Sequence, residues 1–229
     1  MSDVSEVLRL IEELPESEQK QVFSALRQKI PIHQMEKTLM APAETILEAI
    51  ARSSDLTVRG IEGIIAESSF AVEVVPTLFG LTAHPIFGDQ AYDFLLADEV
   101  GQVRVQVKMQ RRKMRLPLRA SDVQKSRKWP TDHFVVETQR TRAGTSSEGT
   151  STRPYRFGSF DILAVSMGAS QGRWSAFMYT VERWLLSATD TTCLLTYQPV
   201  PAARSDFWTD DFAECLRWYR SEIDKRIPG

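Results

Sequence analysis

The feature that constrains this chain most is a predicted β-hairpin at residues 92–110, with the sequence YDFLLADEVGQVRVQVKMQ. Two strand-like runs, residues 91–97 and 102–109, flank a polar cluster that ends in Gly101, which is a common signal for a hairpin turn. A four-residue turn pairs residue 97 with residue 102. The predicted register then assigns each side chain along both strands to one face of the hairpin.

One face of this hairpin carries polar residues that strand formation does not require. Because side chains alternate between the faces of a strand, Asp93 is expected directly opposite Gln106, with Lys108 one diagonal step away and Arg104 on the same face. The opposite face is apolar and is formed by Tyr92, Phe94, Leu96, Val103, Val105 and Val107. A carboxylate, an amide and an ammonium group on one face of a sheet predict a catalytic centre.

This arrangement resembles the PD-(D/E)XK nuclease superfamily, with Asp93 as the first acid and Gln106, Val107 and Lys108 at the (D/E)XK positions. Tyr92 stands at the name-giving proline, and glutamine replaces the second acid. The resemblance implies that Asp93 holds one or two Mg²⁺ ions, for which Mn²⁺ would substitute, and that the Gln106 side chain and Val107 carbonyl complete the coordination. It also implies that Lys108 orients or deprotonates the attacking water.

The neutral amide of Gln106 leaves the implied metal site one negative charge short. Members of the superfamily commonly place a helix before the first core strand, and an acid on that helix can join the site. Glu67, near the end of a predicted helix at 57–69, fits this role better than Glu62, although a solvated helix glutamate is the competing interpretation. Two strand carboxylates are rival ligands, Glu137 and Asp161.

Positive charge is concentrated directly after the predicted hairpin. Residues 101–157 carry 14 Lys and Arg against 4 Asp and Glu, whereas the remainder carries 14 basic and 26 acidic residues. Such asymmetry predicts a polyanion-binding surface, although a solvated basic face is the ordinary alternative. In the loop expected at 140–158, arginines would read guanine or contact only phosphate. The side chains expected to contact DNA are Arg111, Arg112, Lys113, Arg115, Arg119, Lys125, Arg127, Lys128, Arg140, Arg142, Arg153 and Arg156.

The element order predicts an α/β fold. Helices are expected at 3–30, with a break near Pro15, and at 42–52, 57–69, 120–129 and 206–224. Strands are expected at 70–79, in the hairpin, at 133–139 in a central position, and at 160–167 and 174–181. This order resembles the restriction-endonuclease-like mixed central sheet flanked by helices. We therefore expect an N-terminal helical region at 1–55, used for packing or dimerisation, and a nuclease domain at 56–229.

Composition and missing motifs argue against several other classes. No apolar run approaches the length of a membrane span, and the acidic, amphipathic amino terminus is unlike a secretory signal, so a cytoplasmic protein without membrane contact is expected. The sequence has no glycine-rich phosphate loop and no dinucleotide fingerprint, so no nucleotide cofactor is expected. Its 2 cysteines and 3 scattered histidines do not suggest a zinc site.

These observations favour a metal-dependent, site-specific double-strand DNA endonuclease of the type II restriction kind. Cutting both strands of a palindromic site would require a symmetric homodimer. A structure-specific repair or junction nuclease is one alternative. Another is a non-catalytic DNA-binding protein in which Gln106 marks a degenerate nuclease site, and a third is an α/β domain whose basic segment binds a protein.

Overall fold

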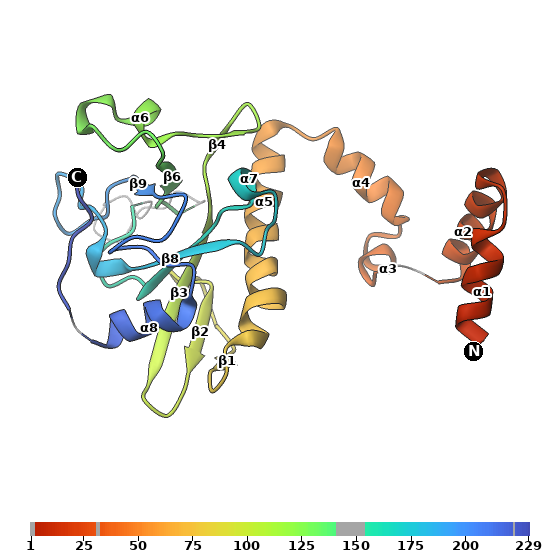
Figure 1. Ribbon diagram of the computed structural model, residues 1–229, viewed down its shortest axis with the longest axis horizontal. Coiled ribbons are helices and arrows are strands. Elements are labelled where there is room, and N and C mark those ends of the chain that lie inside the picture. The colour runs from red at the N-terminus through yellow and green to blue at the C-terminus, as the bar shows by residue number, and fades with distance from the viewer. Residues whose placement is uncertain (1–2, 31–32, 141–153, 222) are drawn as a thin grey trace. The chain divides into compact units, whose positions relative to one another are not determined.

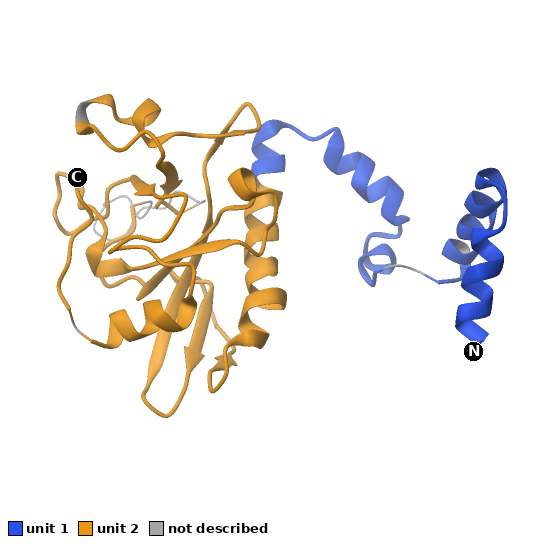
Figure 2. Cartoon of the chain, in the orientation of Figure 1, with its two compact units in different colours: residues 1–59 blue, residues 60–229 orange. Residues whose placement is uncertain are grey.

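The computed structural model describes residues 3–30, 33–140, 154–221 and 223–229. The chain divides into two compact units, residues 1–59 and 60–229 (Figure 2). The boundary falls inside helix α5 (Asp55–Ser69). Within the described ranges, no helix combines the length and the apolar character that crossing a lipid bilayer requires.

The first unit is helical. Its described helices are α1 (Asp3–Glu12), α2 (Glu16–Lys29), α3 (Met35–Leu39) and α4 (Ala43–Ala51), followed by the first turn of α5. The predicted break near Pro15 is confirmed, because this proline directly precedes α2, where its fixed φ and missing N–H are tolerated. No residue of α1, α3 or α4 is buried. These helices therefore contribute no buried side chain to a core.

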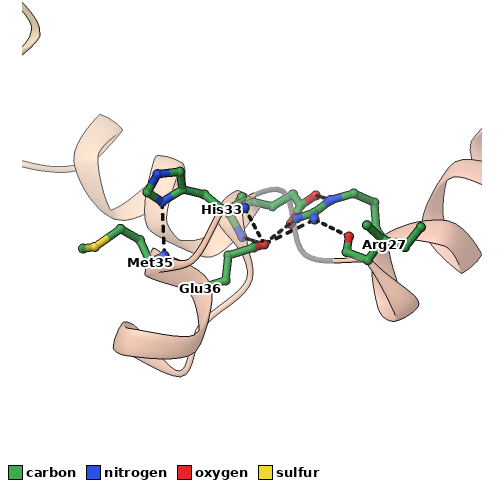
Figure 3. Close-up of polar contacts among 7 residues, drawn as sticks. Arg27, His33, Met35 and Glu36 are labelled. Carbon is green, nitrogen blue, oxygen red and sulfur yellow. Dashed lines mark hydrogen bonds and ion pairs between the residues drawn. The ribbon is translucent and has the colours of Figure 1, made fainter. Parts of the chain in front are cut away.

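An ion-pair network joins the helices of this unit instead. Arg27 of α2 places its Nη2 atom 2.6 Å from Glu36 Oε1 of α3 and 3.2 Å from Glu44 Oε2 of α4. Figure 3 shows Arg27 and Glu36 pointing toward each other. The Arg27 and Glu36 side chains are only 11% and 9% exposed, and Glu36 Oε1 also accepts a hydrogen bond from the Ala43 backbone N–H at 2.7 Å. The carboxylate thus links α2 to the start of α4.

The second unit is built on a mixed five-stranded sheet (Figure 1). Its strands, in spatial order, are β1 (Thr82–His84), β2 (Phe94–Ala97), β3 (Gln102–Met109), β7 (Ile162–Ser166) and β8 (Phe177–Val181). The β3–β7 pair is parallel, and the other neighbours are antiparallel. The predicted hairpin register is confirmed by the pairing of Ala97 with Gln102. The predicted mixed α/β architecture with an N-terminal helical segment is also confirmed.

The two faces of the sheet bury different clusters of side chains. One face packs Val103, Val105 and Val107 of β3 against α5 and against α8 (Phe212–Arg220). The other face carries Leu163 and Val165 of β7 and is covered by residues from the rest of the second unit. Tyr92 packs on this second face, not with Phe94 as the alternation predicted, because it lies before the first residue of β2. Lys108, paired with Val165, also points to the second face.

The prediction of a strand at 70–79 is wrong. After α5 the chain continues as a π-helical segment, Phe70–Val74, and a 3-10 turn, Val75–Thr77. Phe70 and Val74 are both buried in the same cluster, which suits the spacing of one helical turn rather than the alternation of a strand. The β-branched run therefore extends the helix onto the sheet, and the first strand is β1.

The strand expected at 133–139 forms but is not central. It is β6 (Phe134–Glu137), which pairs with β9 (Tyr197–Val200) in a separate two-stranded sheet. Every residue of β7 is buried, and β7 takes the place beside β3. Between the described residues of the two sheets, an isolated bridge joins Gln110 to Val136.

Two predicted helices are shorter than expected. The helix predicted at 120–129 ends at Val123 as α6 (Ala120–Val123) and is followed by a 3-10 turn, Lys125–Arg127. The helix predicted at 206–224 is α8, which starts later because the Asp211 carboxylate caps its first turn by accepting from the Ala213 N–H at 2.8 Å. The remaining described elements are a small hairpin, β4 (Arg112–Lys113) with β5 (Leu116–Pro117), a one-turn helix, α7 (Gly168–Gln171), and a 3-10 turn, Glu182–Trp184.

Candidate active site

The hairpin brings Asp93, Gln106 and Val107 into direct contact. Asp93 extends the β2–β3 pairing, since its N–H donates to the Val105 carbonyl at 2.9 Å. Its Oδ2 atom accepts from the Val107 N–H at 2.8 Å and from the Gln106 side-chain amide. The same Gln106 Nε2 donates to the Val107 carbonyl at 3.0 Å. The amide N–H₂ thus bridges Asp93 and the Val107 carbonyl, two of the groups that the resemblance implies as metal ligands.

Glu67, in the last turns of α5, lies near enough to Asp93 and Lys108 for their charges to act on it. The pKa of Glu67 is raised to about 7, mainly by burial and also by the charge of Asp93, against the opposing effect of Lys108. Burial also raises the pKa of Asp93, against the opposing effects of the Val107 N–H and of Lys108. Two neighbouring carboxylates in a partly buried site disfavour each other's negative charge. A bound divalent cation would relieve this repulsion.

The other candidate acids are committed to arginines. Glu62 pairs with Arg112, Glu137 lies 3.3 Å from Arg111, and Asp161 lies 2.7 Å from Arg104. Asp161 Oδ2 also accepts a hydrogen bond from the Arg104 backbone N–H at 2.7 Å, which joins β3 to the residue that directly precedes β7. Among these acids, Glu67 is the one that forms no ion pair with a described residue.

Lys108 reaches the site from β3. Burial lowers the pKa of Lys108, whereas the charges of Asp93, Glu67 and Glu137 raise it and that of Arg140 lowers it. Its ammonium lies over the ring of Tyr155, with Nζ 5.3 Å from the ring centroid. Sequence reasoning missed Tyr155, which is far from Lys108 along the chain and carries no motif that would have identified it.

The donor set suits Mg²⁺ better than a transition metal. Within the described part of the chain, no cluster of three or more His, Cys, Asp or Glu side chains could hold an ion. Magnesium is commonly bound through one or two carboxylates, with water and substrate phosphate supplying the remaining oxygens. Asp93 and Glu67 meet that requirement, and the amide and carbonyl oxygens of Gln106 and Val107 are further hard donors.

The predicted DNA-contacting side chains divide into paired and exposed groups. Arg111 and Arg112 form the ion pairs described above, and Arg140 lies 3.4 Å from Asp89. The Cζ atom of Arg119 lies 4.3 Å from the centroid of the Phe134 ring, and Arg156 Nη1 donates a hydrogen bond to Thr192 Oγ1 at 3.1 Å. Lys113, Arg115, Lys125 and Lys128 are exposed, as are Arg119 and Arg156 despite these contacts, and Arg127 is partly exposed. Arg142 and Arg153 lie outside the described residues, as does most of the loop predicted at 140–158.

Comparison with known proteins does not place the chain in a family. The sequence matches no protein-family profile, and no curated protein matches it. A solved structure similar to this chain is that of a bacterial homing endonuclease, I-Ssp6803I, with 15% sequence identity and a TM-score of 0.33, covering 64% of this chain and 78% of that chain. A TM-score this low does not establish a shared fold. Membership of the PD-(D/E)XK superfamily stays a prediction, and the function rests on the site itself.

Proposed function

We propose that this protein is a Mg²⁺-dependent endonuclease that hydrolyses phosphodiester bonds in double-stranded DNA, in the manner of a type II restriction enzyme. The observation that carries the proposal is the convergence of Asp93, Glu67 and Lys108 at the end of β3 where the basic segment begins. Neither core packing nor strand pairing requires three charged groups at this position. The 14 basic residues of 101–157 supply the positive potential for a polyanion.

Each residue of the site has a distinct task in this proposal. Asp93 and Glu67 would hold the cation, and Gln106 and Val107 would supply further oxygen atoms if the Gln106 amide turned its oxygen toward the site. When bound, Mg²⁺ supplies positive charge that polarises the phosphate and lowers the pKa of a coordinated water. Lys108, whose pKa is lowered by burial, orients the attacking water or accepts its proton.

The direct test compares Asp93→Ala and Lys108→Ala with the wild-type protein on plasmid and phage DNA in Mg²⁺. Glu99→Ala, an exposed residue in the turn at the other end of the same hairpin, is the matched control. We expect cleavage to be lost in both site variants and kept in the control. Wild-type activity that survives both substitutions would refute the assigned site, and a wild type that cuts no DNA would remove the enzyme proposal. Cuts that share a sequence motif would separate a restriction enzyme from a repair or junction nuclease.

One observation favours a second candidate, a DNA-binding protein without catalysis. The Gln106 amide already satisfies Asp93 and the Val107 carbonyl without any cation. In this candidate the amide is a permanent substitute for the metal. Calorimetric titration with Mn²⁺ discriminates between them, since intact DNA binding without metal-dependent heat would support the second candidate.

A symmetric dimer is the assembly proposed for cutting both strands. The first unit would supply the interface, because α1 exposes large apolar side chains. Val7, Leu8 and Leu10 are 53%, 55% and 51% exposed. Pairing this unit with the same unit of a second copy would remove them from water.

A further inference from the structure

Lys108 is in contact with an aromatic ring, although acids lie nearby. Its Nζ atom lies 5.3 Å from the centroid of the Tyr155 ring. The ammonium forms neither a hydrogen bond nor an ion pair with any described residue, even though Asp93 and Glu67 both act on its charge. A lysine has a flexible four-carbon stem and three donors, so it readily pairs with an acid within reach. Among the described residues, the contact of the ammonium is therefore with the ring of Tyr155.

The ring of Tyr155 is fixed by contacts that do not involve Lys108. Tyr155 is 4% exposed and packs edge-to-face against Phe160, with ring centroids 5.5 Å apart. Its carbonyl accepts from the Leu194 N–H at 2.8 Å, and the residues on either side of it form bridges with Gln139 and Cys193. Because the backbone is held on both sides, the ring presents a rigid face to the lysine.

We propose that Tyr155 is a positioning residue that draws the Lys108 ammonium away from Asp93 and Glu67. The negative face of an aromatic ring attracts a cation, most strongly where water is excluded. The contact keeps Lys108 beside the site without an ion pair that would compete with a divalent cation for the carboxylates. This role rests on the proposed function, because it concerns metal binding at Asp93 and Glu67.

The test is a cycle of four proteins whose Mn²⁺ affinity is measured by calorimetry: wild type, Tyr155→Leu, Lys108→Met and the double variant. Leucine keeps an apolar cover but removes the charge-attracting face. We expect Tyr155→Leu to weaken Mn²⁺ binding by about 3- to 30-fold, which is the change in affinity that corresponds to the free energy of one cation–π contact. In the Lys108→Met background the same change leaves the affinity unaltered, because no ammonium remains to move. Tyr155→Phe keeps the ring and is expected to bind Mn²⁺ like the wild type.

A second measurement follows cleavage as Mg²⁺ is raised. The defect of Tyr155→Leu is recovered at saturating Mg²⁺, whereas that of Lys108→Met is not, since only the former acts through metal affinity. Equal weakening of Mn²⁺ binding in both backgrounds would show that leucine damages the fold, and unchanged binding in Tyr155→Leu would show that the ring has no role. Either result overturns the proposal. Absence of Mn²⁺ binding in the wild type is a different result, because it removes the proposed metal-dependent function as well.

Discussion

Replacing Gln106 with glutamate reverses the hydrogen bonding at the centre of the site. The Gln106 amide nitrogen donates to the Asp93 carboxylate and, at 3.0 Å, to the Val107 carbonyl. A glutamate cannot donate to either group when it is ionised, and it adds a third carboxylate beside Asp93 and Glu67. Without metal, Gln106→Glu should therefore be less stable than the wild type.

The expected loss follows from the bonds that disappear. A hydrogen bond to a charged group contributes about 1.5–3 kcal/mol to the free energy of unfolding, and Gln106 is only 2% exposed, so water does not compensate. For a chain of this length such a change lowers the melting temperature by about 3–12 °C. Millimolar Mg²⁺ should recover much of the loss, because a bound cation stabilises only the folded state and the added carboxylate strengthens its binding.

The assay is thermal unfolding of wild type and variant with and without Mg²⁺. Gln198→Glu is the matched control, because Gln198 is also fully buried and its Nε2 donates to the Leu186 and Leu195 carbonyls, both at 2.9 Å, and not to a carboxylate. It should lose comparable stability and gain nothing from Mg²⁺. If Mg²⁺ leaves the deficit of Gln106→Glu in place, or stabilises both variants equally, the reasoning about a metal at this position is wrong.

Three further predictions concern other parts of the molecule. Burial raises the pKa of Glu182 from 4.5 to about 7, so the folded chain holds a proton that the unfolded chain releases. As the pH rises from 4.5 to 7, this group should lower the free energy of unfolding by about 3 kcal/mol, and Glu182→Gln should remove that contribution in a denaturation series while leaving the one from Glu67. Replacing the exposed Lys113 and Arg115 by alanine should make the slope of log K for DNA binding against log salt concentration shallower by about two, the equivalent of two phosphate contacts, as measured by fluorescence titration. Replacing Lys29 and Lys37 by alanine removes the same charge and should leave the slope unchanged. Leu10→Glu should convert the proposed dimer to a monomer, as measured by light scattering. Val72→Glu changes an exposed residue of the second unit and should leave the dimer intact. A monomeric wild type would contradict the proposed dimer.

The parts of the site that the sequence predicts are those set by local geometry. Asp93, Gln106 and Lys108 lie within one hairpin, and strand alternation plus the turn at Gly101 suffices to place them. The helix that carries Glu67 was also predictable, because apolar residues recur along it at helical spacing. Glu67 itself stays a prediction as a ligand, although the structure gives it the environment of one.

Contacts between distant segments were not predictable in the same way. The β-branched run after Ser69 has strand character by composition, but Phe70 and Val74 pack on the sheet as a continuation of α5. The charge count after the hairpin did not show that Arg111 and Arg112 are already paired with acids, because Glu62 and Glu137 approach them only in the folded chain. The ring of Tyr155 lies over Lys108 in a segment whose neighbouring residues, Pro154 and Arg156, form bridges with Gln139 and Cys193. No local sequence pattern encodes these bridges.

The charge balance of the site offers a physical reason for glutamine at position 106. Ionised Asp93 and Glu67 with protonated Lys108 carry one net negative charge, so a divalent cation makes the site one positive charge in excess. That excess complements the single charge of a phosphodiester, whereas a third carboxylate would neutralise it. Gln106→Glu should therefore bind Mn²⁺ more tightly than the wild type but bind DNA more weakly when the metal is saturating. Filter binding in Ca²⁺, which occupies oxygen sites of this kind, measures the second effect. Tighter binding of both metal and DNA would show that charge balance does not explain the glutamine.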